Sequence, residues 1–186
     1  MTRPVALLSI VLAVTFAVAI AVSSARQPTT APSNQASDLV GRPAPEFVAK
    51  TLDGREVDLS KEKGNVVLMD FWATWCPPCL ASLPHVDAMS KDPELAAKGL
   101  KVWAVNCLKL GKETEQRARD YITEKGLSLP VPLDAEGLTT KNFGIRTIPV
   151  TLVIGRDGII RNHFTNVLGE ENERKIRQAV EEALRQ

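Results

Sequence analysis

The sequence predicts one α/β domain in which helices flank a central mixed β-sheet, with a β-hairpin as an N-terminal extension. Three observations lead to this prediction: short apolar segments alternate with helical patterns, a hairpin signal follows them, and an amphipathic pattern ends the chain. The length of 186 residues, 44% of them hydrophobic, suits one domain of ordinary size.

The first strands are marked by alternation and by buried runs. Residues 47–59 alternate around the turn signal Asp53-Gly54, which predicts a β-hairpin. Residues 66–73 are continuously apolar except for Asp70, as expected for a strand covered on both faces. Residues 100–107 predict the next buried strand.

Helical patterns follow the two buried strands, and one more helical pattern ends the chain. One helix is expected from residue 76 or 77 to 90, and another over residues 113–125, where Glu113 is spaced to pair with Arg117. The last helix is predicted from apolar side chains that recur with helical spacing: Ile176, Ala179, Val180, Ala183 and Leu184.

Shorter elements are expected between the second and the last helix. Residues 129–133 read as a short strand, and residues 135–143 as a short helix. Residues 150–154 and 159–164 flank the turn Arg156-Asp157-Gly158, which predicts a second hairpin.

Residues 1–25 read as a signal peptide or a membrane anchor. Residues 5–22 are apolar except for two hydroxyl side chains, and Arg3 precedes them. As a helix this run would span roughly 27 Å, slightly less than a hydrocarbon core of about 30 Å. Cleavage after Ala25, retention as an anchor and a buried core helix all stay open. The first two place the rest of the chain outside the cytoplasm.

Residues 26–39 have few large apolar side chains and predict a flexible linker, so the folded domain should span residues 40–186. The chain has 23 basic and 22 acidic residues. Two of the basic residues and one acidic residue precede Gly41, which leaves 21 of each in the domain. This balance excludes an electrostatic nucleic-acid binder.

The chemistry centres on Cys76-Pro77-Pro78-Cys79, at the predicted junction of strand and helix. A helix N-terminus favours the thiolate, which is the species that attacks disulfides. We expect Cys76 to be the exposed, electron-rich nucleophile and Cys79 to resolve the mixed disulfide. Because neither proline has an N–H, the first amide available to the Cys76 sulfur is that of Cys79. The Cys76 pKa should then lie nearer neutrality than beside a donor-bearing dipeptide.

Two structural roles for the pair remain open: a zinc site and a plain disulfide. Zinc needs about four ligands, and only Cys107, His85 and His163 remain to complete the set. A disulfide that closes so short a loop removes little entropy from the unfolded chain. We expect Cys107 to pack in the core as a small apolar side chain, with a role as a third redox thiol as the alternative.

Residues 70–79, Asp-Phe-Trp-Ala-Thr-Trp-Cys-Pro-Pro-Cys, resemble the active-site segment of the thioredoxin superfamily. Residues 41–47, the Asp53-Gly54 turn, and residues 143–149 followed by Asp157-Gly158 resemble its exported TlpA/ResA-like branch, which is related to the AhpC/TSA and redoxin families. The resemblance covers essentially the whole predicted domain and implies a thioredoxin-like fold.

The resemblance also implies roles for single residues. It makes Cys76 and Cys79 the redox pair and Pro149 a cis-proline that faces them, with an ordinary trans proline as the alternative. The backbone of Ile148 would then pair with an extended substrate segment by strand addition. Trp75 would shield the pair and offer a flat apolar docking surface.

Asp70 matches the buried aspartate of thioredoxins. A lone carboxyl in an apolar strand has a raised pKa unless it finds a partner, and this suits a proton acceptor for Cys79. A hydrogen-bonded strand-end aspartate is the alternative. Many proteins of the branch carry a glutamate three residues after the second cysteine, where this chain has Ser82. That acid function is therefore absent or has moved to Asp70.

The sequence thus predicts an exported thiol-disulfide oxidoreductase that acts on protein dithiols or disulfides, more as a reductant than as an oxidant. The resemblance implies cytochrome c maturation or disulfide control and an upstream membrane electron donor. The apolar run over residues 5–22 would serve as a membrane tether if it is retained, and no cofactor or metal is expected. An AhpC/TSA-type peroxidase is one alternative, although such enzymes place a threonine three residues before the reactive cysteine and Thr74 lies two before Cys76. A non-enzymatic binding module is the other.

Overall fold

The computed structural model describes residues 39–166 and 169–186. The predicted signal or anchor over residues 1–25, and nearly all of the predicted linker, lie outside the described residues. Within the described ranges, no helix is long and apolar enough to cross a bilayer.

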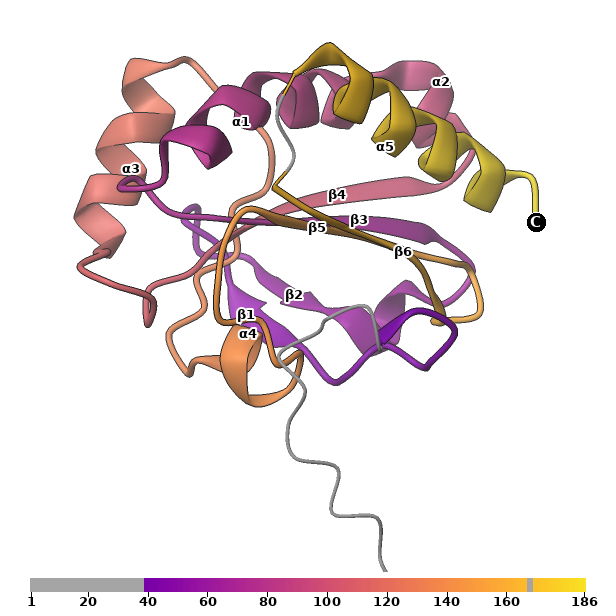
Figure 1. Cartoon of the computed structure of the whole chain (residues 1–186), viewed down its shortest axis with the longest axis horizontal. Helices are drawn as coiled ribbons and strands as arrows, with labels where there is room; N and C mark the ends of the chain where they lie inside the picture. Colours follow the sequence, from indigo (N-terminus) through magenta and orange to yellow (C-terminus); the bar gives the residue numbers. More distant parts are fainter. Residues whose placement is uncertain (1–38, 167–168) are drawn as a thin grey trace, which may run out of the picture. The chain divides into compact units, whose positions relative to one another are not determined.

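The core of the domain is a four-stranded mixed sheet in the order β4-β3-β5-β6. Its strands are β3 (Val66–Trp72), β4 (Leu100–Asn106), β5 (Val150–Ile154) and β6 (Ile160–Thr165). β3 pairs in parallel with β4 and antiparallel with β5, which pairs antiparallel with β6. The long apolar strands were all predicted, and the mixed sheet confirms the expected fold class (Figure 1).

The longer helices gather on one face of this sheet (Figure 1). They are α1 (Pro77–Ser90), α2 (Pro93–Ala97), α3 (Glu115–Glu124) and α5 (Glu170–Leu184). Alternate β3 side chains point toward them because successive strand residues face opposite sides. Val66, Leu68 and Trp72 join Leu83 of α1 and Val180 of α5 in one buried cluster.

The predicted N-terminal hairpin covers the opposite face, together with a short helix (Figure 1). The hairpin consists of β1 (Val48–Lys50) and β2 (Glu56–Asp58), a 3₁₀ turn over Leu59–Glu62 follows it, and the helix is α4 (Leu138–Lys141). Here Phe47 and Phe143 pack against Met69 and Phe71, the β3 side chains of the other parity.

Residues 129–133 do not form the predicted strand. The Pro130 carbonyl accepts from the Ala104 amide at 2.9 Å, and the Pro132 carbonyl accepts from the Asn106 amide at 2.8 Å. The two prolines have no N–H to return, so the segment borders β4 without a regular ladder.

The helix predicted over residues 135–143 is reduced to α4, which has four residues. Gly137 adopts the left-handed region with φ 71°, so no helix can run through it. The Asp134 carboxylate instead accepts from the Leu138 amide at 2.6 Å and from the Thr139 amide at 2.9 Å, which caps the short helix.

The helix predicted from residue 113 begins at Glu115, with Thr114 as its N-cap. The Thr114 hydroxyl accepts from the Arg117 amide at 3.2 Å. Glu113 lies before the helix and hydrogen-bonds to Thr74, so the predicted pair with Arg117 is wrong.

α2 is not among the predicted elements, although its start carries a readable signal in the sequence. Asp92 caps it by accepting from the Glu94 and Leu95 amides at 3.0 and 3.2 Å, and Pro93 occupies the first helical position. Aspartate followed by proline is a common helix start.

Pro84 lies inside α1, where it leaves the Leu80 carbonyl without its usual donor. The Tyr121 hydroxyl of α3 donates to that carbonyl at 3.3 Å. The Tyr121 ring also contacts Trp72, with 5.8 Å between ring centroids. The Tyr121 hydroxyl thus replaces the missing donor and links α3 to α1.

Candidate active site

Cys76 and Cys79 form a disulfide at the point where β3 leads into α1. Their Cα atoms are 5.3 Å apart. Cys76 is the N-cap of α1 in an extended conformation, and its sulfur accepts from the Cys79 amide at 3.3 Å. Pro77 and Pro78 fill the first two helical positions and have no N–H to donate. The sequence prediction that Cys79 supplies the first amide is therefore confirmed.

The two cysteines differ little in exposure. Cys76 is 4% exposed and Cys79 is fully buried, so Cys76 is the more accessible of the pair but is less exposed than predicted. Trp72, Leu83 and the other members of the helix-side cluster surround the pair. Cys76 is therefore the only one of the two with any exposed surface.

The segment before β5 lies at the same end of the sheet as the disulfide. The Ile148–Pro149 peptide bond is cis. The next residue, Val150, pairs with Phe71, whose carbonyl lies 4.0 Å from the Cys79 sulfur. Ile148 is partly buried and contacts the clusters on both faces of the sheet. Whether Ile148 and Pro149 bind substrate stays a prediction.

Trp75 is the exposed aromatic side chain beside the disulfide. It is 42% exposed, and its indole N–H donates to the Leu110 carbonyl at 3.0 Å. Gly111, with φ 64°, lies against the indole so closely that a Cβ at this position would be 2.9 Å from the ring. Glycine lets the loop pack closely against the indole, and the rest of the Trp75 side chain stays exposed.

Asp70 is buried in the middle of β3, on the side that faces α1 and α5. Its Oδ1 accepts from the Thr151 hydroxyl at 2.7 Å, while Oδ2 has no hydrogen-bond partner among the described residues. Burial raises the pKa of Asp70 to about 6, and the Thr151 hydrogen bond opposes this shift. The carboxyl is thus able to take up and release a proton near neutral pH.

Glu113 belongs to the site but was missed as a site residue. It is 7% exposed, and its carboxylate accepts from the backbone amide of Thr74, from the Thr74 hydroxyl at 3.1 Å and from the Thr114 amide at 2.9 Å. These bonds hold the residue two positions before Cys76 against the start of α3. The contact joins segments 39 residues apart, and no local sequence signal indicates it.

Cys107 is fully buried and belongs to the cluster on the opposite face of the sheet from Cys76 and Cys79. Its sulfur lies 3.9 Å from the Thr139 hydroxyl. Burial raises the pKa of the Cys107 thiol well above its usual range. These features match the predicted core role.

Comparisons with known proteins find redoxin-type, thioredoxin-like and thiol-disulfide exchange proteins. The family model described as Redoxin matches residues 39–180. The thioredoxin-like protein YneN of Bacillus subtilis is 32% identical over 137 residues, which cover 73% of this chain and 78% of YneN. The thiol-disulfide oxidoreductase ResA of Bacillus thuringiensis is 27% identical over 139 residues, or 75% of each chain.

A crystal structure of a DsbE-type protein from Chlorobium tepidum has the same fold. It is 30% identical, with a TM-score of 0.68, and the match covers 78% of this chain and 97% of that chain. The similarity therefore spans the domain and includes the segment that carries the two cysteines.

Proposed function

Because the chain belongs to the Redoxin family and is a thiol-disulfide oxidoreductase of the thioredoxin-like class, we propose that it reduces disulfides of other proteins outside the cytoplasm through Cys76 and Cys79. The observation that carries the proposal is the Cys76–Cys79 disulfide at the N-terminus of α1. There the helix dipole and the Cys79 amide favour a thiolate on Cys76 once the pair is reduced.

In the proposed reaction, the reduced protein carries a thiolate on Cys76 and a thiol on Cys79. The Cys76 thiolate attacks the target disulfide, forms a mixed disulfide and releases one target thiolate. Cys79 then gives its proton to the Asp70 carboxylate and attacks the Cys76 sulfur. The Cys76–Cys79 disulfide forms and the second target thiolate leaves, so two electrons pass from the protein to the target. The two target thiolates take up protons from solvent, and Asp70 releases the proton that it received from Cys79 to solvent.

The Pro-Pro filling supports reduction as the main direction. Only the Cys79 amide donates to the Cys76 sulfur from the first turn, because Pro77 and Pro78 have none. A less stabilised thiolate makes the dithiol a better electron donor. The predicted signal or anchor supports action outside the cytoplasm, and we propose that a membrane donor returns the electrons.

The substrate side of the proposal rests on one end of the sheet. Trp75 offers an exposed apolar surface beside the disulfide, and the Ile148–Pro149 segment lies at the same end. An extended peptide with a disulfide would pair with the Ile148 backbone and contact Trp75.

Trapping tests this proposal. The probe is an unfolded peptide with one intramolecular disulfide, mixed with reduced wild type and with Cys79→Ser, Cys76→Ser and Cys107→Ala variants. We expect Cys79→Ser to accumulate a mixed disulfide through Cys76, because the resolving thiol is absent. Cys76→Ser should form none, and Cys107→Ala should turn over like wild type.

Other outcomes would contradict the proposal. If neither Cys76→Ser nor Cys79→Ser changed the function of the protein, the protein would be a binding module that does not use the two thiols. Rapid turnover with hydrogen peroxide but none with the peptide would indicate a peroxidase. Mass spectrometry of the trapped species, without reductant, identifies the cysteine that is linked.

A further inference from the structure

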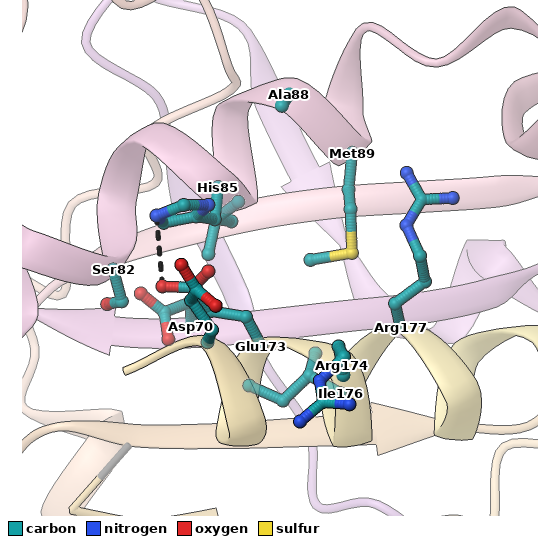
Figure 2. Close-up of a pocket in the computed structure, with 11 residues that line it drawn as sticks. Asp70, Ser82, His85, Ala88, Met89, Glu173, Arg174, Ile176 and Arg177 are labelled. Carbon is teal, nitrogen blue, oxygen red and sulfur yellow. Dashed lines mark ion pairs between the residues drawn. The ribbon is translucent and has the colours of Figure 1, made fainter. Parts of the chain in front are cut away.

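A cavity of about 440 Å³ lies between α1 and α5, with Asp70 among the residues of its wall (Figure 2). Ser82, His85 and Met89 line it from α1, and Glu173 and Ile176 from α5. Asp70 is only 1% exposed, and its Oδ2 has no hydrogen-bond partner among the described residues. An unpartnered carboxylate oxygen in a cavity wall is a place where water can bind.

The wall of this cavity contains an ion pair between the two helices. The His85 Nε2 and the Glu173 Oε1 are 2.9 Å apart, drawn as the dashed line in Figure 2. The His85 side chain is 53% exposed and that of Glu173 23%, so the pair has contact with solvent.

The other groups that face Asp70 are few. From α5 the cavity is also lined by Glu170, Arg174 and Arg177. The neighbours on the sheet are Ala104 on β4 and Thr151 on β5, neither of which is charged. Arg174 pairs with Glu171, at 2.7 Å, and Arg177 with Asp92, at 3.2 Å. His85, oriented by a carboxylate, is thus the group in the cavity wall best suited to proton transfer.

The exchange reaction requires such a route. Asp70 takes a proton from Cys79 in every cycle and must release it before the next one. Asp70 itself is almost fully buried, so a proton reaches solvent only through its surroundings. The α1–α5 cavity connects the carboxyl to the only imidazole among its lining residues.

We propose that His85, held by Glu173, is a positioning residue that passes protons between solvent and Asp70 through water in the α1–α5 cavity. This rests on the proposed function, because it concerns the proton that Cys79 gives up. No electrons move in this step: the proton on Asp70 goes to the imidazole by way of water, and the imidazole returns to its starting state by releasing a proton to solvent.

The test uses 5,5′-dithiobis(2-nitrobenzoate) as probe, because its two leaving groups separate the two steps. Attack by Cys76 on reduced protein releases the first coloured thiolate, and attack by Cys79 on the mixed disulfide releases the second. In His85→Gln we expect the second phase to slow about tenfold near neutral pH. This loss is smaller than the roughly 100-fold that a group in direct contact with the transferred proton contributes, because His85 acts through water and Asp70. The first phase should stay within about twofold of wild type.

Three comparisons separate proton transfer from a structural effect. Added imidazole should restore the second phase in His85→Gln and leave wild type unchanged. In an Asp70→Asn background, His85→Gln should have no further effect, because both act on one proton. Lys175→Gln, which breaks the exposed Lys175–Glu171 pair on the same helix, should leave both phases unchanged.

Glu173→Gln provides a second variant, since it keeps His85 and removes the carboxylate that orients it. An unchanged second phase in both variants would overturn the proposal, and so would a loss of rate in His85→Gln that persists in full beside Asp70→Asn. Absence of the first phase in wild type would instead overturn the proposed function itself.

Discussion

The Asp70 carboxyl lowers the stability of the fold increasingly as the pH rises, because burial favours its neutral form. Its folded pKa is about 6, against an ordinary value of 3.8 for an aspartate carboxyl. Below about pH 4 both the folded and the unfolded chain are protonated, and the fold loses nothing through this group. As the pH rises toward 6 the unfolded chain ionises first, so the free energy of unfolding falls. Above about 6 the loss is complete, at no more than about 3 kcal/mol.

Asp70→Asn should therefore raise the free energy of unfolding at alkaline pH. We expect a gain of about 1–3 kcal/mol near pH 8 and almost none near pH 4, because asparagine keeps an oxygen for the Thr151 hydroxyl and cannot ionise. Urea unfolding of the oxidised protein at both pH values measures the gain. Asp157→Asn is the control: this carboxylate is exposed and its pKa is lowered, chiefly by the Ile159 amide, so no gain is expected. An equal gain at both pH values would contradict the assignment.

Pro78 limits the donors that reach the Cys76 sulfur. In Pro78→His the new residue adds an amide and an imidazole near the first turn of α1, both of which favour a thiolate. We expect the midpoint of the pH dependence of Cys76 alkylation to fall by at least about one unit. Pro78→Ala restores the amide alone and should give a smaller shift. A midpoint in Pro78→His equal to that of wild type would show that this donor does not control reactivity.

At the scale of the elements, Glu113 ties the loop after β3 to the start of α3. Its carboxylate accepts from Thr74 and Thr114, so it supports the turn that places Cys76. Glu113→Ala leaves the two Thr74 donors and the Thr114 amide without this acceptor.

We expect Glu113→Ala to lower the free energy of unfolding by about 1–3 kcal/mol, the usual cost of unsatisfied buried groups. The Thr74 amide should also exchange its hydrogen faster. Glu115→Ala removes only the exposed pair with Arg119 and should cost less than about 1 kcal/mol. Urea unfolding and hydrogen exchange measure both effects. Equal costs for the two variants would mean that Glu113 is not the anchor of the loop.

The sequence predicts those elements whose signals are local. The buried strands β3 and β4 follow from their apolar runs, α5 from its helical spacing, and both hairpins from Asp-Gly turns. The start of α3 differs because Glu113 finds a partner 39 residues away, and residues 129–133 differ because two prolines remove ladder donors. Such tertiary contacts and missing donors do not change the local pattern.

At the scale of the whole molecule, some features of the site have a local sequence signal and others depend on contacts between distant segments. The reactive pair is readable from Cys-Pro-Pro-Cys, and Asp70 from its place in an apolar strand. The Trp75 support at Gly111, the Glu113 contact and the α1–α5 cavity each join segments far apart in the chain. They depend on the packing of α3 and α5 against the sheet, which periodicity alone does not specify.

The topology brings these parts to one region of the sheet. β3 ends at the disulfide, and the antiparallel strand β5 begins beside it, so the Ile148–Pro149 segment lies at the same end. Cys107 packs on the opposite face, away from the reactive pair. The fold thus places Cys76 and Cys79 together at one end of the sheet and buries Cys107 on its other face.

Redox titration of the full chain against mixtures of reduced and oxidised dithiothreitol, with alkylation and mass spectrometry, tests the central claim most directly. The account predicts one reversible two-electron transition in which Cys76 and Cys79 become accessible to alkylation together. The extent of alkylation of Cys107 should be the same in the fully reduced and the fully oxidised protein. An irreversible transition, or a disulfide that includes Cys107, would contradict it.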